Sequence, residues 1–114
     1  MSAPLKQLLI ADLVEGSGRE CGRRSIVQVH YVGRLLADGT EFDNSYKSGQ
    51  TFTVQLGTRQ VIAGWDQGIP GMRVGGKRSL RIPASLGYGS QGFPGLIPPG
   101  SDLEFEVELL QVLA

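Results

Sequence analysis

Alternation between apolar and polar residues is clearest at the C-terminal end of the chain. There the apolar residues share one face of an extended strand and the acidic residues share the other: Leu103, Phe105, Val107 and Leu109 against Asp102, Glu104, Glu106 and Glu108. A period of two is typical of an antiparallel strand that buries one face and leaves the other in water. We therefore predict a half-buried strand here, with a row of solvated carboxylates.

Four further segments have the pattern of strands. Residues 26–36 hold apolar side chains in one phase, and Asp38-Gly39, a strong signal for a tight turn, follows them. Residues 51–56 and 77–82 are two more candidates. Residues 7–15 form a weaker candidate, which we expect to be an edge strand.

One segment breaks the strand pattern. Between residues 61 and 69, Ile62, Trp65 and Ile69 recur at i, i+3 and i+7, which is one face of a helix. Two glycines weaken this helix and Pro70 ends it. A helix so short is not stable alone, so we expect it to lie against the concave face of a sheet. The pattern thus predicts a curved antiparallel sheet, one short helix and one long flap.

That flap is the segment at residues 85–100, which is dense in residues that break regular structure. Three of the six prolines and five glycines lie in it, so we predict neither helix nor paired strand. Its apolar content argues against disorder and predicts a flap over a binding surface. The side chains that carry this prediction are Tyr88, Phe93, Leu96 and Ile97.

The flap also contains Gly87-Tyr-Gly-Ser-Gln-Gly92, which matches the glycine pattern of dinucleotide-binding sites. That pattern has to open a helix whose N-terminus holds a pyrophosphate. Phe93-Pro94 follows at once, which prevents a helix from beginning there. We interpret these glycines as turn residues.

Length and charge limit the classes of partner. The chain of 114 residues fits one domain, residues 1–114, and its 11 Lys and Arg balance its 11 Asp and Glu. Without a long basic run, neither nucleic acid nor an anionic membrane is expected as a partner. No apolar run approaches the ~18 residues of a membrane span, and the single Cys21 allows no internal disulfide. We expect a cytoplasmic monomer.

Conventional catalytic groups are few. His30 is the only histidine and lies within a strand pattern, where a packed or surface role is commoner than catalysis. No pair of histidines or cysteines has metal-ligand spacing, and the acidic row is expected to be a solvated face rather than a cation site. We therefore expect no metal and no cofactor.

Aromatic residues are the remaining candidates, and they lie in separate elements: Tyr31, Phe42, Phe52, Trp65, Tyr88, Phe93 and Phe105. An ordinary core is one interpretation, particularly for Phe52 and Phe105. A binding pocket is the other, because most of the set flanks breaks in regular structure. A packed core also does not require tyrosine hydroxyls, which need partners when buried.

At these residues the chain resembles a known family, the FKBP-type peptidyl-prolyl isomerases, or FK506-binding immunophilins. Five ordered motifs, from about residue 22 to the C-terminus, carry the resemblance: Val29-His-Tyr-Val-Gly33, Asp38-Gly-Thr-Glu-Phe-Asp43, Val61-Ile-Ala-Gly-Trp65, Tyr88-Gly89 with Phe93-Pro-Gly-Leu-Ile-Pro-Pro99, and Leu103-Glu-Phe-Glu-Val-Glu-Leu109. Each motif alone is weak, but the ordered set is specific. It implies an α+β fold, a five- or six-stranded antiparallel half-barrel wrapped around one short helix.

The resemblance also implies a site with Trp65 at its floor. The Tyr88 hydroxyl and the Ile62 backbone N–H, in the first turn of the helix, are expected to bind substrate carbonyl groups. The implied catalytic residues are Tyr31, Phe42, Asp43, Ile62, Trp65, Tyr88 and Phe105. The implied substrate-binding residues are Phe52 and Val61, with Phe93, Leu96 and Ile97 from the flap.

Two positions depart from the family's usual pattern. An arginine is common five residues after the position of Asp43, where this chain has Ser48, so Lys47 is the candidate to replace it. Phe93 stands at the flap tip where a histidine is common, which implies a changed substrate preference.

The implied function is rotamase activity, in which the pocket accelerates rotation of X-Pro peptide bonds and assists protein folding. The implied partners are proline-containing peptides, folding proteins, and macrolides such as FK506 or rapamycin. The alternative is a non-catalytic binding module that docks proline-containing partners or macrolides.

Overall fold

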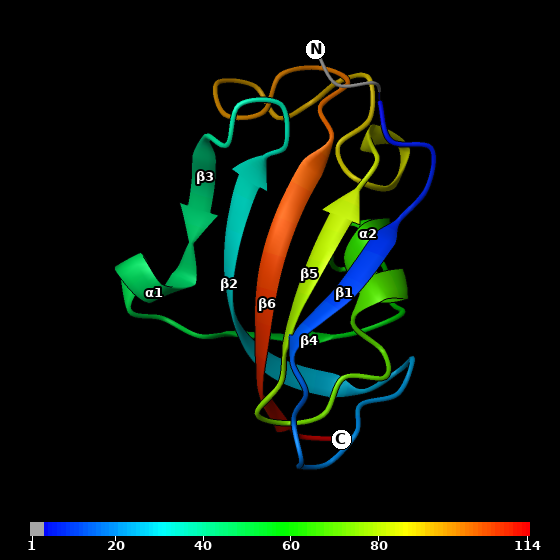
Figure 1. Cartoon of the computed structure of the whole chain (residues 1–114), viewed down its shortest axis with the longest axis vertical. Coiled ribbons are helices and arrows are strands. Elements are labelled where there is room, and N and C mark those ends of the chain that lie inside the picture. Colours follow the sequence, from blue (N-terminus) through cyan, green and yellow to red (C-terminus); the bar gives the residue numbers. More distant parts are fainter. Residues whose placement is uncertain (1–3) are drawn as a thin grey trace.

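The computed structural model describes residues 4–114, and in this part of the chain six strands form one antiparallel sheet (Figure 1). In chain order the strands are β1 (Leu9–Val14), β2 (Ile26–Leu35), β3 (Glu41–Asn44), β4 (Phe52–Gln55), β5 (Lys77–Ile82) and β6 (Leu103–Val112). The sheet has the order β1-β5-β6-β2-β3. The first half of β2 pairs with β4 and its second half pairs with β3. The expected α+β fold is confirmed.

The alternation that predicted the last strand reappears in the burial of β6. Leu103, Val107 and Leu109 are fully buried and Phe105 nearly so. The glutamates between them are half-buried. Since β6 pairs with β2 on one side and β5 on the other, its apolar face forms the middle of the core.

Helix α2 (Ala63–Gly68) packs against this core, and two glycines allow its close approach. A Cβ built on Gly64 would lie 2.6 Å from Ile82, and one built on Gly68 would lie 2.7 Å from Leu80. Both distances are shorter than packed atoms allow. These positions therefore need glycine, although glycine lowers helix propensity.

Strand β3 and helix α1 (Ser45–Ser48) were not predicted from the sequence. Helix α1 begins where the Asn44 side chain accepts hydrogen bonds from the backbone N–H groups of Tyr46 and Lys47, at 2.9 and 3.2 Å. This is a side-chain cap, which asparagine provides well. It makes a four-residue helix possible without a hydrophobic repeat.

The prediction that residues 85–100 hold no helix was wrong at the start of this segment, and no strand lies within it. A 3₁₀ helix covers Ala84–Leu86. Phe93 and Ile97 form a β-bridge in which each N–H donates to the other residue's carbonyl at 2.8 Å. The flap is therefore a loop with internal hydrogen bonds. Across residues 4–114, no helix is both long enough and apolar enough to cross a bilayer.

We expect Gly64→Ala to destabilise the protein, because the added methyl group overlaps Ile82 in a packed core. Overpacking costs about 1–3 kcal/mol, which exceeds the gain of about 1 kcal/mol in helix propensity. Gln67→Ala, an exposed position on the same helix, is the control and should be neutral or slightly stabilising. The thermal midpoints measure both effects, and an unchanged midpoint for Gly64→Ala would contradict this account of the packing.

Candidate active site

A cavity of about 420 Å³ opens beside α2, on the apolar side of the sheet. It is lined by residues from β2, β3, β4, β6, the segment around α2 and the flap: Tyr31, Phe42, Asp43, Phe52, Gln60, Val61, Ile62, Trp65, Tyr88 and Phe105. Nine of these ten residues were predicted from the sequence. Gln60 was not, because a glutamine in a loop carries no aromatic or hydrophobic signal.

Trp65 is the centre of the aromatic wall. Its ring meets those of Tyr31, Phe105 and Phe52 edge to face, with centroids 5.0, 5.3 and 6.1 Å apart. Phe42 meets Phe105 in the same way at 5.5 Å. Pairs of this geometry each contribute about 0.5–1.5 kcal/mol beyond burial. The wall is therefore held rigid by its own contacts.

The tryptophan itself lies at the bottom of the cavity and is 3% exposed. Its Nε1–H is buried and has no hydrogen-bond partner within residues 4–114. A buried donor without a partner is costly, so the position of the ring is imposed by packing. The face that Trp65 presents is apolar.

Gly33 is a site residue that sequence reasoning missed. A Cβ on Gly33 would lie 2.7 Å from the Phe105 ring and 2.8 Å from the Phe42 ring. Both rings therefore pack on bare backbone of β2. The signal was present, because Gly33 ends the first of the five motifs, but a glycine inside a strand does not reveal what packs on it.

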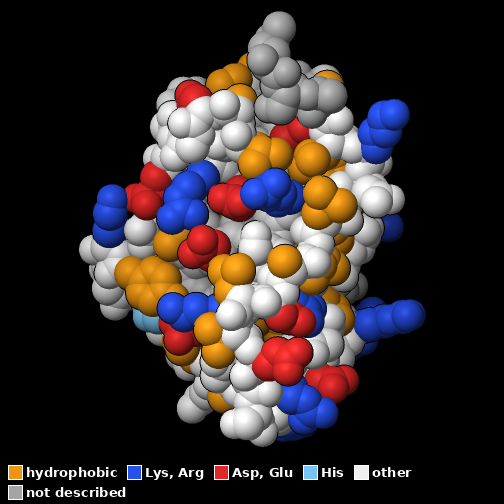
Figure 2. Space-filling view, in the orientation of Figure 1, with side chains coloured by type: hydrophobic (Ala, Val, Ile, Leu, Met, Phe, Trp, Pro, Cys, Tyr) orange, Lys and Arg blue, Asp and Glu red, His pale blue; other side chains and the backbone are white. Residues whose placement is uncertain are grey.

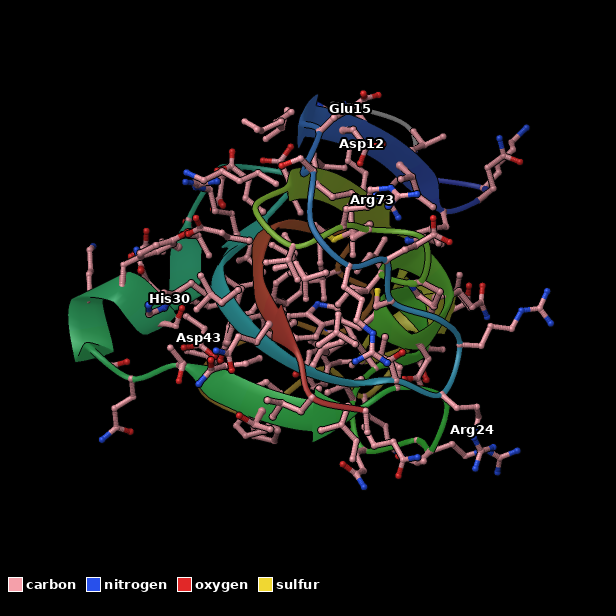
Figure 3. All side chains as sticks on the ribbon, turned by 90° about the horizontal axis from the view of Figure 1, so that it is seen from below. Asp12, Glu15, Arg24, His30, Asp43 and Arg73 are labelled. Atoms are coloured by element: carbon pink, nitrogen blue, oxygen red, sulfur yellow. The ribbon has the colours of Figure 1, made fainter. Side chains whose placement is uncertain are left out.

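Asp43 is oriented by a tyrosine. The Tyr31 hydroxyl donates to Asp43 Oδ2 at 2.6 Å, and Figure 3 labels Asp43, which comes from β3. Lys47, the residue suggested as a replacement for the missing arginine, pairs instead with Glu41 at 2.7 Å. Ser48 donates to the Ser45 carbonyl within α1.

Two hydrogen-bond donors at the cavity remain available. No hydrogen bond joins the Tyr88 hydroxyl to another residue of the described chain, and burial followed by the charge of Asp43 raises the pKa of this hydroxyl. The Ile62 N–H likewise has no partner within residues 4–114. Ile62 is the residue before α2, in the N-cap position, rather than part of the first turn. Its backbone N–H comes before the helical hydrogen-bond ladder, which therefore offers it no acceptor.

The other three flap residues do not line the cavity. Phe93 and Leu96 are half exposed, and Phe93 packs edge to face on Tyr88 at 5.9 Å. Ile97 is buried in the core. Within the described structure, Ile97 anchors the flap, and Phe93 and Leu96 are left at its outer surface.

His30 lies outside the cavity. Its ring stacks on Tyr46 at 4.5 Å and its Nδ1 lies 2.8 Å from Ser45 Oγ.

Two glutamates of the acidic row on β6 form ion pairs with nearby arginines. Glu104 pairs with Arg81 at 3.3 Å and Glu106 with Arg34 at 3.6 Å.

Comparison with known proteins assigns the chain to a family. Residues 18–110 match the family described as FKBP-type peptidyl-prolyl cis-trans isomerase. An FK506-binding protein of Neisseria meningitidis is 51% identical over 105 residues, which are 92% of this chain and 95% of that protein. Peptidyl-prolyl cis-trans isomerase FPR2 of Saccharomyces cerevisiae is 57% identical over 86 residues, 75% of this chain and 64% of that protein. The chain belongs to the FKBP-type peptidyl-prolyl cis-trans isomerase family.

Solved structures agree with this assignment. The crystal structure of AtFKBP13 matches with a TM-score of 0.86 and 41% identity, over 97% of both chains. The crystal structure of FkpA from Escherichia coli matches with a TM-score of 0.82 and 44% identity, over 92% of this chain and 47% of that one.

The hydrogen bond between Tyr31 and Asp43 predicts a loss of stability in alkali. Burial, and then this bond, raise the pKa of Tyr31 above its ordinary value. An unfolded tyrosine loses its proton near pH ~10 while the folded Tyr31 keeps it, so the unfolded state binds fewer protons and stability falls as the pH rises. Tyr31→Phe lacks this contribution. When the pH rises from about 8 to 11, its thermal midpoint should fall less than that of the unaltered protein. An equal fall in both proteins would contradict the hydrogen bond.

Proposed function

We propose that this protein is a peptidyl-prolyl cis-trans isomerase that rotates X-Pro bonds in the aromatic cavity. The observation that carries the proposal is the pairing of a rigid apolar wall with two unused donors, the Tyr88 hydroxyl and the Ile62 N–H. A proline ring fits against the Trp65 face, and peptide carbonyls on either side of it require donors. The family to which the chain belongs supports the same activity.

The reaction requires no bond to break. Resonance holds a peptide bond planar with a barrier of ~18–20 kcal/mol, and X-Pro bonds exchange over tens to hundreds of seconds. Bringing this exchange to milliseconds takes about 10⁴-fold, or roughly 5–6 kcal/mol. The energy has to come from binding the twisted amide better than the planar one.

The cavity offers two sources of this energy. A twisted amide has a less polar carbonyl than a planar one, so an apolar wall penalises it less than water does. One neutral hydrogen bond contributes about 0.5–1.5 kcal/mol, so Tyr88 alone is insufficient. Desolvation and strain of about 1–5 kcal/mol, drawn from contacts along the rest of the substrate, supply much of the remainder.

The side chains at the cavity also keep the chemistry simple. Tyr31 and Tyr88 are protonated at neutral pH, as an ordinary tyrosine is, and burial and Asp43, which raise both pKa values, extend this into alkaline pH. Tyr31 uses its proton to hold Asp43 in place, and Tyr88 keeps its proton for the substrate. His30 takes no part, because it is engaged at Ser45 and Tyr46.

Proline-containing peptides and folding proteins are the proposed substrates, and macrolides such as FK506 or rapamycin the proposed ligands. The curated relatives named FK506-binding proteins support the second group. The cytoplasm is the proposed location. A binding module without turnover is the competing function, and the same cavity would serve it.

Cis–trans exchange of a short X-Pro peptide, followed by NMR at substoichiometric protein, separates the two functions. We expect strong acceleration. Tyr88→Phe should lose a few-fold to about tenfold of kcat/KM, because one hydrogen bond is removed. Phe42→Ala should lose more, because it opens the wall to water.

Tyr46→Phe is the matched control for this experiment. Tyr46 is also partly exposed, but its hydroxyl donates to Glu108 outside the cavity. It should keep full activity. No acceleration by the unaltered protein leaves only the binding module. Full activity in folded Tyr88→Phe and Phe42→Ala would place the reaction elsewhere.

We expect a macrolide of the FK506 type to quench the emission of Trp65, the only tryptophan. Its proline-like ring would lie against the indole at the cavity floor. Phe42→Ala should weaken this binding, and the ligand should inhibit isomerisation at the concentrations that quench. Unchanged emission at a large excess of ligand contradicts the assignment of the cavity.

A further inference from the structure

The segment between β4 and α2 forms one side of the cavity without regular structure. Strand β4 ends at Gln55 and α2 begins at Ala63, so residues 56–62 belong to neither element. Three of these residues line the cavity, and we call them the loop wall: Gln60, Val61 and Ile62. Because the hydrogen bonds of a helix or sheet do not hold them, other contacts have to fix their positions.

Asp66, in the first turn of α2, supplies two such contacts. Its Oδ1 accepts a hydrogen bond from the Gly57 N–H at 2.9 Å, and its Oδ2 accepts one from the Arg59 N–H at 3.3 Å. Hydrogen bonds to a carboxylate are stronger than those between neutral groups. Asp66 directly follows Trp65 in the helix. One turn of α2 therefore joins the floor of the cavity to the segment that leads into the loop wall.

Arg59 has a backbone conformation that needs support. Its φ is 61°, and within residues 4–114 it is the one non-glycine residue with a positive φ. The Cβ of an L-residue is crowded in this left-handed region, so residues with side chains avoid it. Strained conformations persist where surrounding contacts impose them. The bond from the Arg59 N–H to Asp66 is such a contact, and it lies one residue before the loop wall.

The other end of the loop wall is also attached to α2. The Ile62 carbonyl accepts hydrogen bonds from the Trp65 N–H at 3.0 Å and the Asp66 N–H at 3.3 Å. With the carbonyl fixed, the direction of the free Ile62 N–H depends on the path of residues 57–61. Asp66 holds the first part of that path.

We propose that Asp66 is a positioning residue for the isomerase reaction. Its carboxylate holds residues 57–59, with Arg59 in the left-handed conformation, and so sets the place of the loop wall and of the Ile62 N–H. This inference rests on the proposed function, because it concerns the same cavity. Asp66 does not itself line the cavity, so it acts on the substrate only through the loop wall.

A purely structural role is the alternative, because a carboxylate that holds a loop also stabilises the folded state. The two roles differ in their kinetics. A smaller folded fraction lowers the apparent kcat and leaves KM unchanged. Displacement of the loop wall weakens contacts that the substrate makes in both its planar and its twisted forms, and a loss of such uniform binding raises KM.

Asp66→Asn tests the two roles. The carboxamide has the size of the carboxylate but one acceptor oxygen in place of two, so one of the two hydrogen bonds should be lost. Exchange of a short X-Pro peptide is followed by NMR over a range of peptide concentrations. We expect KM to rise by about threefold to tenfold, with a smaller change in kcat.

Glu104→Gln is the matched control. Glu104 is a half-buried carboxylate that Arg81 Nε holds at 3.3 Å. It lies on the face of the sheet away from the core, where Figure 2 shows acidic and basic side chains next to one another, and it does not line the cavity. This variant should leave KM unchanged, whatever the loss of the ion pair does to the thermal midpoint.

A second substitution tests the part played by Arg59. Glycine adopts a positive φ without steric cost, so a loop with glycine at this position depends less on Asp66. In the Asp66→Asn background, Arg59→Gly should bring KM back towards that of the unaltered protein. Arg59→Ala is the control, because it removes the same guanidinium group and keeps the crowded Cβ. It should not recover KM.

Hydrogen exchange of backbone amides measures the contact independently of activity. In the unaltered protein the Gly57 and Arg59 amides should exchange more slowly than the Thr58 amide between them, which donates to no group in the described part of the chain. Asp66→Asn should speed the exchange of at least one of the two.

Several results would overturn the proposal while the isomerase activity stands. They are an unchanged KM in Asp66→Asn, an equal rise in Glu104→Gln, equal recovery by Arg59→Gly and Arg59→Ala, and Gly57 and Arg59 amides that exchange as fast as that of Thr58.

No acceleration by the unaltered protein would reject the proposed function instead. The dissociation constant of an FK506-type ligand, measured by Trp65 emission, then takes the place of KM in the same comparisons. A protein that neither accelerates exchange nor binds the ligand has no site for Asp66 to position, which overturns both proposals.

Discussion

The close approach of α2 to the sheet is the constraint on which the site depends. Gly64 and Gly68 let the helix backbone touch the side chains of β5, and Trp65 lies between them in the sequence. Any side chain at either glycine would push the helix outward and carry the indole with it. Ile62 immediately precedes the same helix. One packing contact therefore sets the floor of the cavity and the place of a backbone donor, which is why a short and intrinsically weak helix occupies the centre of the fold.

The hydrogen bond between Tyr31 and Asp43 is the polar counterpart of this packing. At the position where the resemblance led us to expect an arginine, Ser48 donates to the Ser45 carbonyl, and the neighbouring Lys47 pairs with Glu41. Asp43 lines the cavity and is thus oriented there by a neutral donor, the Tyr31 hydroxyl. Burial raises the pKa values of both Tyr31 and Tyr88, and Asp43 raises them further. Both tyrosines therefore keep their protons to a higher pH than an ordinary tyrosine does.

Sequence reasoning succeeded where one physical signal acted alone. Period-two burial located β6, and the spacing of Ile62, Trp65 and Ile69 located α2, although its ends were one or two residues off. It missed α1, because a helix that begins at the Asn44 cap needs no hydrophobic repeat in the sequence. It also missed β3, which is only four residues long. The aromatic residues of the cavity were predicted as a set through the resemblance, since composition alone also allowed an ordinary core. Gly33 and Gln60 were missed because their roles exist only once other elements pack on them.

The strands at the two edges of the sheet, β3 and β1, differ in length and in polarity. At one edge β3 is four residues long, three of them polar, and it leads into the capped helix α1, so another strand finds little to pair with. That short edge leaves the mouth of the cavity accessible. At the other edge β1 is longer, fully exposed and apolar. An edge of this kind favours aggregation unless a specific partner covers it. The exposed apolar edge at β1 contributes no residue to the lining of the cavity.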